Sequence, residues 1–175
     1  MSRPGDRPPA LPPAVDSMTL LVAAVIVHDT VADRVLLLQR GERSKFGQGM
    51  WDLPVGKSDP GEPVTATAVR ELHEETGLTV DPGDLTLAHV VHGAWGVESP
   101  AGFLTVVFAT RTWHGQPENR EPGKHSQVRW TPVTDLPTPM VPSTDLALRS
   151  YLDGGLAISL HGWPPTPPPD PRPPS

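Results

Sequence analysis

The stretch that decides the fold runs from residue 56 to residue 78 and reads GKSDPGEPVTATAVRELHEETGL. Residues 63–76 within it show helix signals at both ends, because Pro63 suits the first helical position and Gly77 suits a C-terminal stop. One side of this helix is apolar, formed by Ala68, Val69 and Leu72. We therefore predict a polar loop followed by a helix that packs on a sheet.

Three glutamates occupy the last turns of the predicted helix. At about 100° per residue, Glu71 and Glu75 lie roughly 40° apart around the helix axis, and Glu74 lies beside Glu71. Like charges at this spacing repel by roughly a few tenths of a kcal/mol even when exposed. Arg70 stands at ion-pair spacing from Glu74, and a divalent cation such as Mg²⁺ also binds carboxylate oxygens. On composition alone, the alternative is an acidic helix face that meets only solvent.

The spacing of the stretch is more specific than its composition. Gly56 is followed after five residues by Glu62, and after seven more by Arg70-Glu71-Leu72-x-Glu74-Glu75-x-Gly77-Leu78. This pattern resembles the complete Nudix box, with all nine of its defining positions filled across 23 residues. The resemblance extends from WDLP at 51–54 to about residue 152, so it spans the whole predicted domain.

The resemblance to the Nudix family implies an α/β fold, an α/β/α sandwich with a mixed β-sheet. It further implies that Glu71, Glu74 and Glu75 bind the metal, together with a backbone carbonyl at or before Gly56. Arg70 would orient the carboxylates, so that Arg70, Glu71 and Glu74 belong to the catalytic group. The expected cofactor is Mg²⁺, with Mn²⁺ as an alternative.

Glu62 and Val55 lie in the loop before the helix. By the resemblance, Glu62 supports the start of the helix. Val55 is a departure, because the family usually has a second glycine before Gly56. Since the expected contribution of this position is a backbone oxygen, valine can make it if its φ is negative.

The implied reaction is hydrolysis of a pyrophosphate bond. Bound metal ions neutralise the phosphoryl oxygens, acidify a water and hold the attacking and leaving oxygens in line. The family uses as base either a box glutamate or a glutamate on a later loop. Glu121, in PENREPGK at 117–124, matches the later position; the alternative is an ordinary loop carboxylate.

The substrate expected from the resemblance is a nucleoside triphosphate or a related diphosphate derivative. Residues 113–137 resemble Nudix enzymes that act on nucleoside triphosphates, including those that remove oxidised purine nucleotides. The matching positions are Pro117, Asn119, Glu121-Pro122, Lys124, Trp130 and Leu136-Pro137. The products expected from a triphosphate are therefore the nucleoside monophosphate and pyrophosphate.

Four residues are candidates for substrate contacts. Asn119 offers a donor and an acceptor to a base edge, and Arg43 and Lys45 lie in a glycine-rich loop where they can hold phosphate oxygens. Trp95 is a candidate stacking surface. The structural alternatives are loop capping for Asn119, solubility for the two cations and core packing for Trp95.

Strands are expected on both sides of the box. Residues 20–28 and 34–39 form a predicted hairpin, residues 41–50 a polar loop, and three further strands follow at 85–92, 102–111 and 127–131. A closing helix over 143–152 would be capped by Ser143 or Thr144. Mixed strands with two helices also suggest an α/β/α sandwich.

The 24 prolines crowd at the two ends of the chain, over 4–13 and 164–174. We therefore expect disordered proline-rich tails at 1–17 and 162–175 around a Nudix domain at 18–161. Docking of the C-terminal tail on a proline-reading domain is the functional alternative.

The charge and composition of the chain limit the classes of partner that we expect. The formal charge is -6 with no cysteine, so we expect neither a duplex nucleic acid nor a membrane as partner, and a cytoplasmic location. His89 and His92 are three apart on a predicted strand, which disfavours a shared zinc site. A homodimer is an assembly that the sequence leaves open.

Three other functions remain as alternatives. One keeps the fold and changes the substrate to a nucleoside diphosphate sugar, ADP-ribose, a dinucleoside polyphosphate or another diphosphate. Another is a non-catalytic Nudix domain that senses a nucleotide, although the box here is whole. A scaffold protein rests only on the proline-rich ends.

Overall fold

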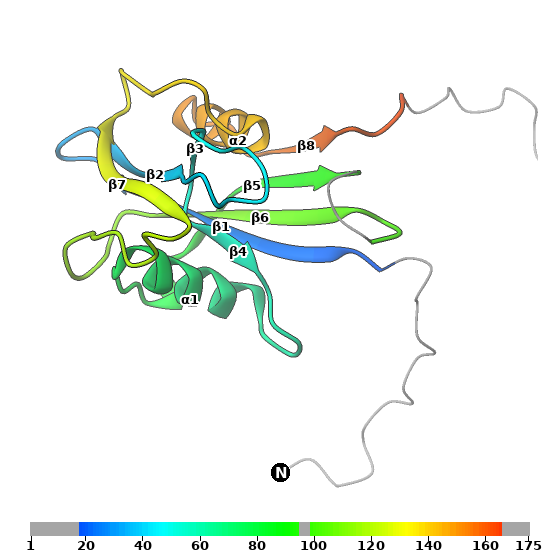
Figure 1. Ribbon diagram of the computed structural model, residues 1–175, viewed down its shortest axis with the longest axis horizontal. Helices are drawn as coiled ribbons and strands as arrows, with labels where there is room; N and C mark the ends of the chain where they lie inside the picture. Colours follow the sequence, from blue (N-terminus) through cyan, green and yellow to red (C-terminus); the bar gives the residue numbers. More distant parts are fainter. Residues whose placement is uncertain (1–17, 95–98, 166–175) are drawn as a thin grey trace, which may run out of the picture.

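Strand β1 (Leu20–Asp29) is the central strand of the fold and supplies both hydrophobic cores. Its side chains alternate between the two faces, so Ala24 and Ile26 enter one core while Val25 and Val27 enter the other. The structure is a computed structural model that describes residues 18–94 and 99–165. Within them, one mixed sheet lies between two helices (Figure 1), as expected for an α/β/α sandwich.

The sheet contains eight strands in the order β3-β2-β1-β6-β5-β8, while β4 pairs with β1 and β7 pairs with β2. The pairs β1/β6 and β5/β8 are parallel, and the other pairs are antiparallel. The strands after β1 are β2 (Arg34–Arg40), β3 (Trp51–Asp52), β4 (Val55–Lys57), β5 (Thr86–Gly93), β6 (Phe103–Thr110), β7 (His125–Pro132) and β8 (Ala157–His161).

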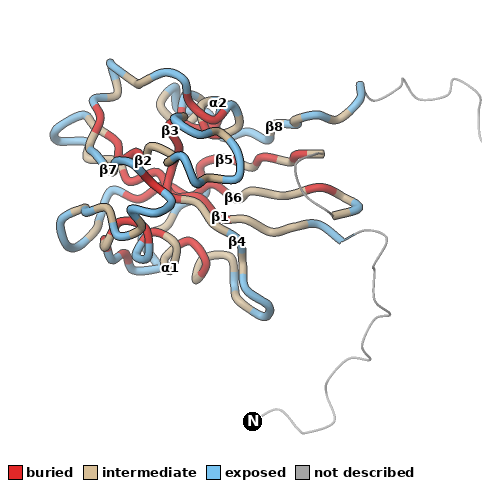
Figure 2. Tube along the Cα trace, viewed as in Figure 1, coloured by how far each residue is buried: buried red, intermediate tan, exposed pale blue. Residues whose placement is uncertain are grey.

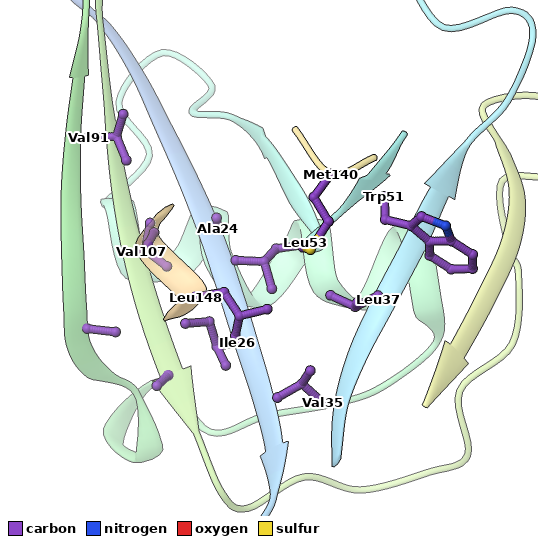
Figure 3. Packing of buried hydrophobic residues seen from close by; sticks show 13 residues of the cluster. Ala24, Ile26, Val35, Leu37, Trp51, Leu53, Val91, Val107, Met140 and Leu148 are labelled. Atoms are coloured by element: carbon purple, nitrogen blue, oxygen red, sulfur yellow. The ribbon is translucent and has the colours of Figure 1, made fainter. Parts of the chain in front are cut away.

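Helix α1 (Val64–Thr76) covers one face of the sheet and α2 (Pro142–Leu152) the other. Ala68 and Leu72 of α1 are completely buried against β1, while Leu148 of α2 lies in the core that also holds Ile26 and Leu37 (Figure 3). Buried segments concentrate in the middle strands and on the inner sides of the helices (Figure 2).

The helix boundaries confirm one prediction and correct two. Gly77 ends α1 in the left-handed region at φ 75°, and its N–H donates to the carbonyl of His73. Pro63 lies just before the helix, with extended backbone, instead of in its first position. The predicted cap of α2 is wrong: the helix begins at Pro142 after Val141, and no side chain caps it. The Thr144 hydroxyl instead donates to Asp52 Oδ1 at 2.5 Å.

The sequence also missed four short elements. These are β3, β4, the 3-10 turn η2 (Pro82–Asp84) and the edge strand β8. Beyond β8, the Trp163 indole N–H donates to the carbonyl of His92 at 3.0 Å and its ring lies 4.6 Å from the His92 ring. Residues 1–17 and 166–175, which hold most of the predicted tails, lie outside the described residues. No described helix is long and apolar enough to cross a membrane.

Candidate active site

Arg70 ties the loop before α1 to the helix. Its guanidinium donates two hydrogen bonds to Glu62, at 2.8 and 2.9 Å, and one to the carbonyl of Lys57 at 2.9 Å. The same Glu62 accepts from the Asp59 N–H and from the Thr67 hydroxyl. These donors, with Arg70 first, lower the pKa of Glu62 to about 2. The Glu62–Arg70 pair therefore holds the loop against the helix, which is a larger role than the support at the start of the helix expected of Glu62.

Arg70 also reaches the two glutamates that follow it. It donates to Glu71 Oε1 at 2.8 Å and to Glu74 Oε2 at 3.2 Å, and the second contact is the ion pair that the sequence predicted. Burial raises the pKa of Glu71, although the hydrogen bond from Arg70 opposes the rise. Glu71 lies at the base of the site, whereas half of the Glu74 side chain is exposed.

The carboxylate of Glu71 packs directly against the backbone of Gly56. A Cβ added to Gly56 would lie 1.9 Å from the Glu71 carboxyl carbon, so the carboxylate occupies the space of a side chain. Glycine is therefore required here for close approach and not for an unusual φ. The neighbouring Val55 has no positive φ, since Asp33 is the one described non-glycine residue with that conformation. Valine thus meets the condition set for this departure from the family pattern.

Glu75 points inward from the last turn of α1 and is only 4% exposed. Its Oε2 accepts the backbone N–H of Val55 at 3.0 Å, which aligns β4 with the helix. Burial is the main reason that the pKa of Glu75 is raised well above its ordinary value, and the Glu71 charge adds to it. A carboxylate held in this way is costly to ionise without a cation.

Two residues from the loop after β6 and the start of β7 reach Glu75. Possible ligand atoms of Glu75, Glu121 and His125 all lie within 4.8 Å of one another. Glu121 Oε1 pairs with Lys124 Nζ at 2.7 Å, whereas Glu121 Oε2 is buried without a hydrogen-bond partner among the described residues. The structure thus places Glu121 beside the box.

His125 is the residue of this cluster that the sequence did not single out. Its side chain is 6% exposed, and Nε2 lies 3.5 Å from Glu75 Oε1. Burial lowers the pKa of its imidazole. The available signal was local: a histidine follows Glu121 by four residues and stands two residues before the predicted strand at 127–131. Nothing in the sequence placed that strand against α1.

An apolar cavity of about 470 Å³ opens on the other side of β4. Its walls come from β1, β5, β6 and the start of α2, and they include the rings of Phe46 and Phe103. Val55 and Gly56 line the cavity while also contacting Glu75 and Glu71. The acidic cluster and a cavity of ligand size therefore share one short strand as a wall.

The residues predicted to contact the substrate differ in exposure and in their distance along the chain from the residues that line the cavity. Arg43 and Lys45 are exposed in the 41–50 loop. This loop contributes Phe46, Gly47 and Met50 to the lining of the cavity. Asn119 is half-buried, and its amide donates to the carbonyl of His125 at 2.8 Å, so it braces the loop. Trp95 lies outside the described residues.

Comparison with known proteins agrees with this geometry. The NUDIX domain model matches residues 18–151. The chain is 30% identical over 141 residues to the 8-oxo-dGDP phosphatase NUDT18 of Homo sapiens, which covers 79% of this chain and 40% of that protein. It is 28% identical over 144 residues to the CTP pyrophosphohydrolase of Escherichia coli (strain K12), covering 77% and 92% of the two chains.

A solved structure is similar over the same region. The crystal structure of a MutT NUDIX hydrolase from Burkholderia pseudomallei matches with a TM-score of 0.66 and 28% identity, over 75% of this chain and 97% of that one. The chain spans 40% and 34% of the lengths of the human and mouse NUDT18 proteins. The family match covers α1, the acidic cluster and most of the sheet, and this chain therefore belongs to the Nudix hydrolase family.

Proposed function

We propose that this protein is a divalent-metal-dependent pyrophosphohydrolase that converts a nucleoside triphosphate to the monophosphate and pyrophosphate. The observation that carries the proposal is the buried Glu75 beside Glu121, together with Val55 and Gly56, which contact Glu75 and Glu71 and also line the apolar cavity. A nucleoside in the cavity would direct its phosphates over β4 towards the carboxylates. A base and a phosphate chain need these two environments side by side.

The acidic residues fit a divalent cation. Glu75 is buried near Glu71 and Glu121, and each of these charges raises its pKa. Glu121 also has a buried oxygen with no hydrogen-bond partner among the described residues. We propose Mg²⁺ as the cofactor, with Mn²⁺ as the alternative, held by Glu75 with Glu71, Glu74 and the backbone near Gly56. Bound there, the ion would neutralise phosphoryl oxygens and acidify a water.

The protein's own residues would then orient the reaction. The water oxygen forms a bond to a phosphorus of the α–β bridge, the bridging P–O bond breaks, and a carboxylate accepts the water's proton. Glu71 and Glu121 are the two candidates for that base. Arg70 holds Glu71 and Glu74 in place, and Lys124 holds one oxygen of Glu121, so each carboxylate is positioned before substrate binds.

The experiment that tests this proposal is product analysis across a nucleotide panel. The named activities of the relatives include one on 8-oxo-dGDP and one on CTP, so the panel should contain both, with 8-oxo-dGTP, ADP-ribose and a nucleoside diphosphate sugar. We expect monophosphate and pyrophosphate from triphosphates, with EDTA abolishing turnover. Accumulation of nucleoside diphosphate would contradict cleavage at the α–β bridge. Nucleotide binding without any product would support the non-catalytic sensor instead.

Four further properties are also proposals. We propose that the catalytic domain spans residues 18–161 and that the protein is cytoplasmic. We also propose that Arg43, Lys45 and Asn119 contact the substrate when it is bound. For Arg43 and Lys45, the support is their position in the loop that contributes Phe46 to the cavity. A homodimer is the proposed assembly, and its support is three exposed apolar side chains: Leu156, just before β8, and Ile158 and Leu160 within it. Light scattering coupled to size-exclusion chromatography measures that state directly.

A further inference from the structure

His125 shares a buried position with two carboxylates that come from different elements. Glu75 belongs to the last turn of α1, Glu121 to the loop before β7, and His125 to the first residue of β7. Nε2 of His125 is 3.5 Å from Glu75 Oε1, which is long for a hydrogen bond. It is closer to the separation of two ligands of one cation, since neighbouring ligands at about 2.1 Å from an ion lie roughly 3 Å apart.

The cluster also contains polar atoms that nothing in the described protein satisfies. Glu121 Oε2 and His125 Nδ1 are both buried and have no hydrogen-bond partner among the described residues. Buried polar atoms without a partner are rare in folded proteins, and a bound cation is one way in which a carboxylate oxygen of this kind is satisfied. The nearby cations are already engaged, because Lys124 pairs with Glu121 Oε1 and Arg40 pairs with Asp52.

The backbone fixes His125 before any ion binds. Its N–H donates to the carbonyl of Glu121 at 2.9 Å, and its own carbonyl accepts from the Asn119 amide at 2.8 Å. Its Cα is paired with Arg40 of β2. Asn119 is therefore a positioning residue for His125, which gives this half-buried loop amide a role in the site.

We propose that His125 supplies a nitrogen ligand to the catalytic cation, alongside oxygen ligands from Glu75 and Glu121. This assignment rests on the proposed metal-dependent function and specifies its metal. Mg²⁺ prefers oxygen ligands and keeps its waters, whereas an imidazole among carboxylates favours first-row transition ions. The site therefore binds Mn²⁺ more tightly than Mg²⁺.

Electron spin echo spectroscopy of Mn²⁺ bound to the 175-residue chain tests the nitrogen ligand without using activity. We expect modulation from a directly bound ¹⁴N nucleus, and its replacement by the ¹⁵N pattern when all histidines carry ¹⁵N. The His125→Gln variant should lose this modulation and bind Mn²⁺ at least roughly 10-fold more weakly, with a smaller change for Mg²⁺. The matched control is His73→Gln, because His73 lies exposed on α1 outside the cluster.

The outcomes separate this inference from the proposed function. The ligand assignment is wrong if Mn²⁺ binds to the wild-type protein without nitrogen modulation. It is also wrong if the modulation survives in His125→Gln. Both conclusions hold even if nucleotides are hydrolysed. Nitrogen modulation in a protein that hydrolyses no nucleotide upholds the metal site and removes the hydrolase proposal. If His125→Gln does not fold, the isotope exchange in the wild-type protein still decides between a nitrogen ligand and none.

Discussion

Gly56 and Glu71 occupy space that only one side chain can fill: a Cβ on Gly56 would lie 1.9 Å from the Glu71 carboxyl carbon. This contact explains why a glycine stands there although its φ is not in the left-handed region. It also couples the wall of the apolar cavity to the acidic helix, because Gly56 lines the cavity on its other side.

Gly56→Ala should therefore displace Glu71 and reduce kcat by roughly two orders of magnitude, since a shift of about 1 Å in a catalytic group has effects of that size. The control is Gly123→Ala, because a Cβ at Gly123 meets nothing within 4 Å and its φ is not positive. Steady-state kinetics and circular dichroism of both variants test the prediction. Equal turnover in the two alanine variants would show that Glu71 tolerates displacement.

Arg70→Lys should lower both activity and stability although the charge is kept. Lysine cannot make the paired hydrogen bonds to Glu62 while also reaching Glu71, because it offers one compact donor group. We expect a loss of about 1–3 kcal/mol in the free energy of unfolding, measured in urea. Arg149→Lys is the control, since Arg149 pairs with Asp145 on the exposed side of α2. Similar unfolding curves for the two variants would contradict a special role of Arg70.

The Glu62–Arg70 pair should make part of the free energy of unfolding sensitive to acid. The pKa of Glu62 falls from 4.5 to about 2, so the carboxylate stabilises the folded state above pH 4.5 and this contribution is lost as pH falls towards 2. In Glu62→Gln the contribution is absent at every pH. Urea unfolding between pH 6 and pH 2.5 should show the stabilities of wild type and variant converging as the pH falls. Parallel curves would be inconsistent with this pair.

Glu75→Gln should separate folding from catalysis. The glutamine can still accept the Val55 N–H, but the substitution removes a buried charge that burial makes costly, so the metal-free variant should melt at a higher temperature near neutral pH. The sign follows because an acid with a raised folded-state pKa loses stability as pH rises above 4.5. Turnover should fall by orders of magnitude, as a metal ligand is lost. Wild-type turnover in Glu75→Gln would exclude Glu75 from the metal site.

Truncation tests where the catalytic domain ends. A chain of residues 18–161 is expected to keep its activity, because residues 1–17 and 162–175 hold few apolar side chains. The contact of Trp163 with His92 gives a sharper comparison. A chain of residues 18–165 should melt at a higher temperature than one of residues 18–161, with the same kcat. A lower kcat for the shorter chain would show that the segment after β8 supports the site.

The sequence by itself determined the helix, the longer strands and the box. Helix α1 follows from its apolar strip and from Gly77, and β1 follows from its run of valine and isoleucine, since these signals are local and act wherever the segment lies. The fixed spacing of Gly56, Glu62 and Arg70 likewise indicated the family. Short or weakly patterned elements escaped because their pairing partner defines them: β8 is a strand through its ladder with β5.

Only the tertiary structure decided how the box is completed. Asn119 was a candidate for a base edge or for loop capping, and the fold brings its amide to the carbonyl of His125, while the contact with a base stays a proposal. Thr144 was expected to cap a helix, and it donates to Asp52, which is 92 residues away in the chain. His125 reaches Glu75 because β7 pairs with β2 beside α1. Residues this far apart in sequence share no local pattern, and the burial and pKa of each depend on neighbours that only the folded chain supplies.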